Sequence, residues 1–270
     1  TRKGATLTLV KTWAANSIAG NTATVTNSGF INNASSGLST ATALGNTTTG
    51  TAITVYAGES GTISETFGVG SAANYDAVLS CTGNTSAVVG NTLTVDPADT
   101  AIICTETNTR KTATLTLRKT WSANSIAGNT VTVTSSGFIN SASSGLSTAT
   151  TIGNTTTGSS VTVYAGESGT INETFGIGSA ANYSAALACT GNASALVGNA
   201  LTVNAADSAI ICTYTNTKTT GSTIQGKVFL DNGKAAATPH NGTQEIGELG
   251  IANITMTLTN CASTTYQSVL

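Results

Sequence analysis

The chain has 270 residues, of which 39% are hydrophobic and only 8% are charged, and its formal net charge is −2. A nucleic-acid partner requires a basic face, so this charge argues against nucleic-acid binding. No apolar run is long enough to span a bilayer, and the many β-branched residues favour folded cores over disorder.

The chain contains the same sequence twice. Residues 1–108 and 109–216 align without a gap, and 85 of the 108 positions are identical. A duplicated unit of this length is a whole domain and not a small solenoid repeat. We therefore predict two complete domains, here called repeat 1 and repeat 2. A linker at 217–223 and a third segment at 224–270 are expected to follow them.

Short alternating apolar runs predict a series of strands in each repeat. In repeat 1 the run at 5–13 places Leu7, Leu9, Lys11 and Trp13 on one face. The stretch 27–50, rich in Ser, Asn, Thr and Gly, is expected to be a loop with one weak strand. Further strands are predicted at 22–26, 52–56, 62–67, 75–82 and 101–108, and a tight hairpin at 88–93. The pattern predicts an all-β fold of tandem antiparallel Greek-key β-sandwiches, similar to immunoglobulin domains.

Four of the five cysteines form two pairs with equal spacing. Cys81 and Cys104 lie 23 positions apart, and Cys189 and Cys212 repeat that spacing. Without a Cys-x-x-Cys pair or a cysteine–histidine cluster, zinc is not expected. One disulfide per repeat, formed in an oxidising compartment, is the simplest interpretation, and two buried free thiols per repeat are the alternative. Cys261 has no partner in the sequence.

Three polar residues of repeat 1 fall in phase with inward-facing apolar neighbours on three different strands. They are Lys11, Glu65 and Asn108, and repeat 2 keeps them as Lys119, Glu173 and Asn216. An isolated buried ammonium or carboxylate is costly in free energy. We therefore expect the lysine and the glutamate to meet in each repeat, or to be neutralised.

Two kinds of site fit this pattern. The first is a buried salt bridge with an asparagine beside it, or residues at strand ends whose side chains reach solvent. The second is an intramolecular isopeptide bond, in which a neutral lysine amine attacks the asparagine carboxamide and releases ammonia. A protonated glutamate would then polarise the carbonyl group and carry protons. Burial shifts the lysine and glutamate pKa values in the direction that this chemistry needs.

Repeat 1 contains the motifs Leu-Thr-Leu-Val-Lys at 7–11, Ile-Ser-Glu-Thr at 63–66 and Cys-Thr-Glu-Thr-Asn at 104–108, and repeat 2 contains close variants of them. With these motifs, both repeats resemble the prealbumin-like (SpaA-like, Cna-B-type) domains of bacterial surface proteins. The resemblance implies an extracellular, structural protein of the bacterial cell surface and a Lys11–Asn108 isopeptide bond with Glu65 as its catalytic residue. The chain departs from the family in one place, because 68–70 is Gly-Val-Gly where a Pro-rich turn is usual.

The third segment contains strand-like motifs at 226–233, 241–251 and 254–261. With these motifs, residues 224–270 resemble the opening strands of the SdrD B-like domain, another sandwich of bacterial surface proteins that often binds calcium. The resemblance implies a calcium site whose oxygen ligands come from Asp231, Asn241, Glu245 and Glu248. A polar surface loop without metal is the alternative, and no other cofactor is expected.

The leading functional hypothesis is a rigid stalk or fibre on a bacterial surface, with copies of itself or other surface proteins as partners. One alternative is a self-assembling filament subunit. Since 224–270 contains only the first strands of a sandwich, a strand from a neighbour could complete it, unless the natural chain continues past Leu270. A second alternative is an adhesin that binds a ligand through its Ser/Thr/Asn loops. An enzyme acting on other molecules is not expected.

Overall fold

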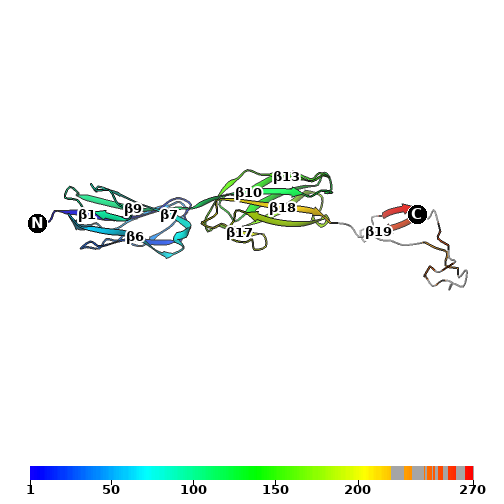
Figure 1. Cartoon of the computed structure of the whole chain (residues 1–270), viewed down its shortest axis with the longest axis horizontal. Helices are drawn as coiled ribbons and strands as arrows, with labels where there is room; N and C mark the ends of the chain where they lie inside the picture. Colours follow the sequence, from blue (N-terminus) through cyan, green and yellow to red (C-terminus); the bar gives the residue numbers. More distant parts are fainter. Residues whose placement is uncertain are drawn as a thin grey trace. The chain divides into compact units, whose positions relative to one another are not determined.

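The structure is a computed structural model that describes residues 1–219, 228–232, 240, 242–244, 246, 249–251, 255–259 and 265–269. It divides into two compact units, Thr1–Thr219 and Thr220–Leu270. Apart from two short 3-10 turns, all regular secondary structure of the first unit is β-strand, which confirms the predicted fold class (Figure 1). None of the helices among these described residues is long and apolar enough to cross a membrane.

Repeat 1 folds into two sheets. In the first, the strand order is β4 (Asn46–Thr49), β1 (Gly4–Trp13), β9 (Ala101–Arg110) and β7 (Tyr75–Thr82), and β5 (Ile53–Tyr56) also pairs with β1. The second sheet has the order β3 (Ser39–Thr40), β2 (Thr22–Ser28), β6 (Ser60–Val69) and β8 (Thr92–Thr94). A single 3-10 turn, η1 (Ala72–Asn74), precedes β7. The inward faces of both sheets supply the hydrophobic core.

Repeat 2 has the same strand order in both sheets. Its strands are β10 (Thr112–Trp121), β11 (Thr130–Ser136), β12 (Ser143–Thr148), β13 (Asn154–Thr157), β14 (Val161–Tyr164), β15 (Ser168–Ile177), β16 (Tyr183–Thr190), β17 (Ala200–Thr202) and β18 (Ala209–Lys218), with the 3-10 turn η2 (Ala180–Asn182) before β16. In the second unit, β19 (Thr255–Thr259) and β20 (Thr265–Val269) form an antiparallel hairpin. Phe229 also bridges to Gly250.

The observed strands match the predicted runs closely, with small differences. The Ser/Thr/Asn-rich stretch 27–50 contains two short strands, β3 and β4, where one was expected. Strand β18 ends at Lys218, so the first two residues of the predicted linker 217–223 belong to a strand. The division between the repeats at 108/109 and the assignment of 224–270 to a partial sandwich stay predictions.

One strand pairing departs from the antiparallel pattern. Strands β1 and β9, the first and last of repeat 1, run parallel, with Lys11 opposite Glu106 and Trp13 opposite Asn108. The other pairings of repeat 1 are antiparallel. Strands β10 and β18 repeat the parallel pairing in repeat 2. The chain therefore enters each repeat on one strand and leaves it on the adjacent parallel strand, at the opposite end of the sheet.

The alternation of β1 explains how a lysine enters the core. Ala5, Leu7, Leu9, Lys11 and Trp13 all face inward and are buried. Beyond Lys11, the Trp13 indole lies edge-on to the rings of Phe67 and Tyr75, with centroids 5.6 and 5.3 Å away. The indole N–H donates to Ser39 Oγ at 3.1 Å, so the only polar atom of this ring is satisfied. Since side chains alternate along a strand, the register that buries Leu7 and Trp13 also buries Lys11.

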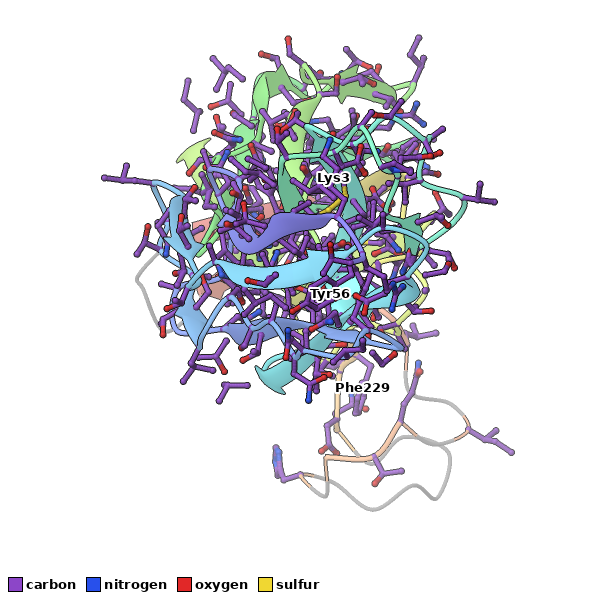
Figure 2. All side chains as sticks on the ribbon, turned by 90° about the vertical axis from the view of Figure 1, so that its left-hand side faces the viewer. Lys3, Tyr56 and Phe229 are labelled. Carbon is purple, nitrogen blue, oxygen red and sulfur yellow. A yellow bond between two sulfur atoms is a disulfide. The ribbon has the colours of Figure 1, made fainter. Side chains whose placement is uncertain are left out.

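Arg110 connects the two repeats within the first unit. It is buried, and its Nε donates to the Ala165 carbonyl of repeat 2 at 2.7 Å, while Nη1 donates to the Asn16 carbonyl of repeat 1 at 3.1 Å. Asn16 Nδ2 in turn donates to the Tyr164 hydroxyl at 2.9 Å. The equivalent residue in repeat 1, Arg2, has a half-exposed side chain that donates to the Ala57 carbonyl at 2.9 Å. Figure 2 labels Lys3 and Tyr56, the sequence neighbours of these two residues.

We predict that Arg110→Ala lowers the free energy of unfolding by about 1–3 kcal/mol, because it leaves buried carbonyl groups without a donor. Arg2→Ala is the matched control and is expected to change it by less than about 0.5 kcal/mol, as exposed substitutions do. The measurement is the urea midpoint at constant m-value. Equal losses in the two variants would contradict the role assigned to Arg110.

Candidate functional site

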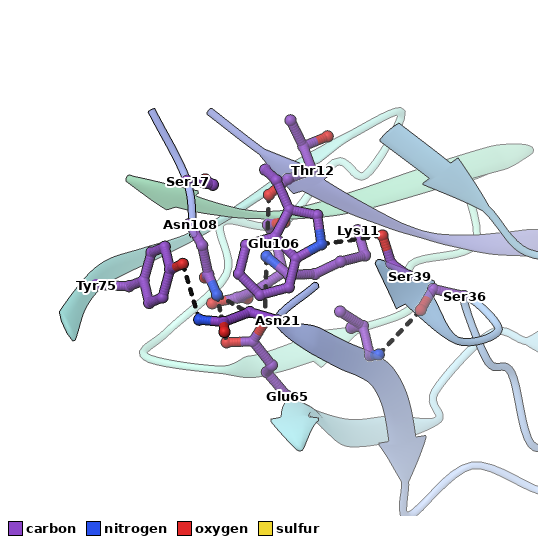
Figure 3. A network of polar contacts seen from close by, with 12 residues as sticks. Lys11, Thr12, Ser17, Asn21, Ser36, Ser39, Glu65, Tyr75, Glu106 and Asn108 are labelled. Carbon is purple, nitrogen blue, oxygen red and sulfur yellow. Dashed lines mark hydrogen bonds and ion pairs between the residues drawn. The ribbon is translucent and has the colours of Figure 1, made fainter. Parts of the chain in front are cut away.

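The three predicted polar residues of repeat 1 meet in the core (Figure 3). Lys11 Nζ lies 3.1 Å from Glu65 Oε1. Asn108 Nδ2 donates to the same carboxylate, at 2.9 Å to Oε1 and 3.1 Å to Oε2. Lys11 and Asn108 are fully buried, and the Glu65 side chain is 10% exposed. Glu65 therefore bridges the amine and the carboxamide.

Three strands bring these side chains together. Lys11 and Asn108 come from the neighbouring strands β1 and β9 of one sheet, and Glu65 comes from β6 of the other sheet. Each lies at an inward position of its strand, as the alternation predicted. The expectation that Lys11 and Asn108 could reach solvent at strand ends is wrong, because both have zero exposed surface.

The lysine amine is held by further acceptors. Its Nζ donates to the backbone carbonyls of Thr12 at 2.9 Å and Glu106 at 3.3 Å, and it lies 4.5 Å from the centroid of the Trp13 ring. The Asn108 carboxamide is less well satisfied. Its Oδ1 is buried and has no hydrogen-bond partner among the described residues. A buried carbonyl oxygen without a donor is costly, and a protonated carboxyl group could satisfy it.

Repeat 2 carries the same site with looser contacts. Lys119 Nζ lies 3.2 Å from Glu173 Oε2 and 4.6 Å from the centroid of the Trp121 ring. It donates to the backbone carbonyl of Tyr214 at 3.4 Å. Asn216 is fully buried, and within the described part of the chain neither polar atom of its side chain has a hydrogen-bond partner.

Burial makes both lysines weaker bases. Desolvation lowers the pKa of Lys11 below its usual value, and the Glu65 carboxylate opposes this shift. In the same way desolvation lowers the pKa of Lys119 to about 8, against the opposing effect of Glu173. With a pKa near 8, about a tenth of the Lys119 amines are neutral at neutral pH, and only the neutral amine is a nucleophile. Each site thus contains a nucleophile, an acid and an amide within one dry cluster.

Sequence reasoning missed one acidic member of the repeat 1 cluster. Glu106 is buried, lies opposite Lys11 across the β1–β9 pairing and precedes Asn108 by two residues on the same face. Alternation along β9 contains the signal that could have found it, because Ile102, Cys104 and Asn108 share its phase.

The disulfides form as predicted. Cys81 bonds to Cys104 and Cys189 to Cys212, so the alternative of free thiols is wrong. In each repeat the two cysteines lie directly opposite each other on antiparallel strands. Closing a loop of this length stabilises a domain by about 3 kcal/mol in the chain-entropy model.

Of the calcium ligands predicted from the SdrD B-like resemblance, only Asp231 lies among the residues that the structure describes. Its carboxylate accepts hydrogen bonds from the backbone N–H groups of His240 at 2.5 Å and Gly242 at 2.8 Å. Asn241, Glu245 and Glu248 lie outside the described residues, as does Cys261. Among the described residues, no group of three or more His, Cys, Asp or Glu side chains could hold a metal ion. The calcium site stays a prediction.

Repeat 1 also has an open hollow of about 420 Å³ that bears on the adhesin alternative. Its lining consists of small polar residues, glycines and one isoleucine: Asn33, Ser35, Ser36, Gly37, Thr49, Gly50, Thr51 and Ile53. Binding pockets are usually lined by apolar and aromatic groups around a few placed polar ones. This lining has no aromatic or charged side chain, so it does not favour the adhesin alternative.

No protein-family model and no curated protein matches the chain. Among solved structures, it is similar to the major pilin protein T-13 of Streptococcus pyogenes serotype GAS131465, with 14% identity and a TM-score of 0.40 over 81% of this chain and 100% of that one. It is also similar to a major pilin from Streptococcus pyogenes (15% identity, TM-score 0.36, 80% and 99% covered) and to the shaft pilin spaA from Lactobacillus rhamnosus GG (13%, 0.25, 81% and 100%). Similarities this low support no conclusion about function.

The lowered pKa of Lys119 predicts how stability depends on pH in a chain whose repeat 2 cannot crosslink, such as Asn216→Ala. Folded Lys119 binds fewer protons than unfolded lysine between pH 8 and 10.5, so the free energy of unfolding should rise with pH across this window. Below pH 8, Lys119 is protonated in both the folded and the unfolded chain, so the full free-energy cost of burying the ammonium group lowers the stability of the folded state.

Denaturation at several pH values checks this expectation. Adding Lys119→Met to the Asn216→Ala chain removes the titrating amine and should flatten the rise. If the slope were the same with and without Lys119, the amine would not titrate in this window.

Proposed function

We propose that the chain is a structural, extracellular repeat protein that forms a rigid stalk or fibre on a bacterial surface, with each repeat stapled by a disulfide and by a Lys–Asn isopeptide bond. The observation that carries the proposal is the buried arrangement of Lys11, Glu65 and Asn108, in which one carboxylate bridges an amine and a carboxamide. Copies of the chain or other surface proteins are its partners. The protein acts on itself and not as an enzyme on other molecules.

The chemistry follows from the residues present. The carboxamide of Asn108 first turns about its Cβ–Cγ bond, so that Oδ1 takes the place of Nδ2 beside Glu65. The neutral Lys11 amine then attacks Cγ of Asn108, and protonated Glu65 donates its proton to Oδ1. The carboxylate of Glu65 then takes a proton from the attacking nitrogen and passes it to Nδ2. The Cγ–Nδ2 bond breaks and ammonia leaves. As the carbonyl group re-forms, Oδ1 returns its proton to Glu65, which is again protonated. The net reaction converts one amine and one primary amide into one secondary amide and ammonia.

The position of the bond explains why it suits a stalk. Tension enters repeat 1 at the beginning of β1 and leaves at the end of β9, and these strands are parallel neighbours. A Lys11–Asn108 bond joins them near their carboxyl ends, so residues 12–107 would carry no tension. The Cys81–Cys104 disulfide lies inside this protected segment and ties β7 to β9. The covalent path therefore passes each sandwich without requiring it to unfold.

Intact mass measured under reducing conditions tests the bond. The wild-type chain is expected to weigh less than its sequence mass by two molecules of ammonia, one for each repeat. Glu65→Gln removes the acid and Asn108→Ala the electrophile, so each variant should lose only the ammonia of repeat 2.

Asn33→Ala, a substitution of an exposed asparagine in repeat 1, is the control and should still lose two. A wild-type chain that retains its full sequence mass would overturn the proposal and leave a buried ion pair as the role of the cluster.

A further inference from the structure

The crosslinking sites of the two repeats differ at one inward position. Lysine, glutamate, asparagine and tryptophan are the same in both, but Glu106 of repeat 1 is replaced by Tyr214 in repeat 2. Both side chains are buried, and the backbone carbonyl of each accepts a hydrogen bond from the site lysine. Repeat 1 therefore combines one amine with two carboxyl groups, where repeat 2 has one amine and one carboxyl group.

One oxygen of the Glu106 carboxyl group is left without a hydrogen-bond partner. It is 6% exposed, and its Oε2 is buried with no hydrogen-bond partner among the described residues. Tyr214, in contrast, uses its hydroxyl to accept a hydrogen bond from Asn199 at 3.2 Å. A carboxyl group with a buried oxygen that has no donor is expensive to ionise, so this environment favours the protonated form of Glu106.

The surroundings of Glu106 contain few other charges. Lys11 lies opposite it on β1, and Glu65 on β6 of the other sheet is near enough to repel it electrostatically. Its partner on β7 is Leu79, and Lys11 has Thr48 opposite it on β4, so these neighbouring strands add no charge there. Burial raises the pKa of Glu106, and repulsion from Glu65 raises it further, while Lys11 opposes the shift. Two carboxyl groups in one site hold a shared proton more tightly than either does alone.

We propose that Glu106 is a positioning residue of repeat 1 that holds a second proton and supplies it to Glu65 when Lys11 is neutral. This inference rests on the isopeptide chemistry proposed above. The step moves one proton: protonated Glu106 and ionised Glu65 become ionised Glu106 and protonated Glu65, beside the neutral Lys11 amine. The site then contains the nucleophile and the acid together, and the crosslinking reaction proceeds as described.

The two repeats consequently differ in the pH range over which they crosslink. In repeat 2 the ion pair of Lys119 and Glu173 holds one proton that can move between the two groups. When solvent removes this proton, the lysine is neutral but Glu173 is ionised, so no acid is left for the reaction. In repeat 1 the proton of Glu106 is additional to the one that the ion pair holds, so it can supply the acid when Lys11 is neutral. The rate of crosslinking in repeat 1, divided by the rate in repeat 2, should therefore increase as pH rises.

The experiment follows both bonds in the full chain as it folds. The chain is made by cell-free synthesis at mildly acidic, neutral and alkaline pH, quenched at intervals and digested, and the two crosslinked fragments are counted by mass spectrometry. Glu106→Gln keeps the shape of the side chain and removes its proton. We expect it to lower the repeat 1 rate at alkaline pH by about tenfold, the factor for one pKa unit, and to remove the pH dependence of the rate ratio.

Conservative and reciprocal variants separate a proton-holding role from a structural one. Glu106→Asp should restore the pH-dependent ratio, and Glu106→Tyr, which installs the residue that repeat 2 tolerates, should give repeat 1 the profile of repeat 2. Tyr214→Glu should extend repeat 2 crosslinking to higher pH. Formation of the Cys81–Cys104 disulfide reports folding of repeat 1 in every variant.

The outcomes distinguish this inference from the proposed function. Absence of both bonds in the wild-type chain would overturn the isopeptide proposal and this inference with it. Two bonds in the wild-type chain, with a rate ratio that Glu106→Gln and Glu106→Tyr leave unchanged at every pH, would overturn the role of Glu106 alone.

Discussion

Burial of a lysine amine in each sandwich is the constraint on which the remaining features of the site depend. Strand alternation places Lys11 between the core residues Leu9 and Trp13, so the fold cannot bury its apolar neighbours without burying the amine. An ammonium there is tolerable only with a carboxylate and backbone carbonyls around it, which Glu65, Thr12 and Glu106 provide. The same desolvation weakens the base and makes a neutral nucleophile available. Burial thus accounts for both the ion pair and the proposed reaction.

The strand order converts this local chemistry into a mechanical property. Because β1 and β9 are parallel neighbours, Lys11 and Asn108 lie on adjacent strands, although 97 positions separate them in sequence. Force applied to the ends loads these two strands in shear, and a bond between them closes the shortest covalent path through the domain. The disulfide secures β7 to the same last strand. Arg110 continues the connection into repeat 2 through carbonyl groups on both sides of the joint.

Much of this arrangement could be predicted from the sequence, because its signals are local. Alternation identified the strands and the inward phase of Lys11, Glu65 and Asn108, and equal cysteine spacing identified the disulfides. The parallel pairing of β1 with β9 is a long-range property that no local pattern encodes. Alternation along β9 also places Glu106 inward, in phase with Cys104 and Asn108. Its place beside Lys11 could not be predicted, because it depends on the long-range pairing of β1 with β9. The contacts of Arg110 depend on how two sandwiches meet, which neither repeat specifies alone.

Stretching single molecules from both ends tests most directly whether the covalent path passes each repeat. The account predicts that the wild-type chain shows no unfolding extension from either repeat. A chain with Asn108→Ala and Asn216→Ala should extend in two unfolding steps, one for each repeat. Each step should be shorter than full extension of the repeat, because the disulfide keeps the segment between its two cysteines from extending. Reduction of the disulfides should lengthen both steps by that segment. Unfolding steps from both repeats of the wild-type chain, as long as those of the double variant, would contradict the account.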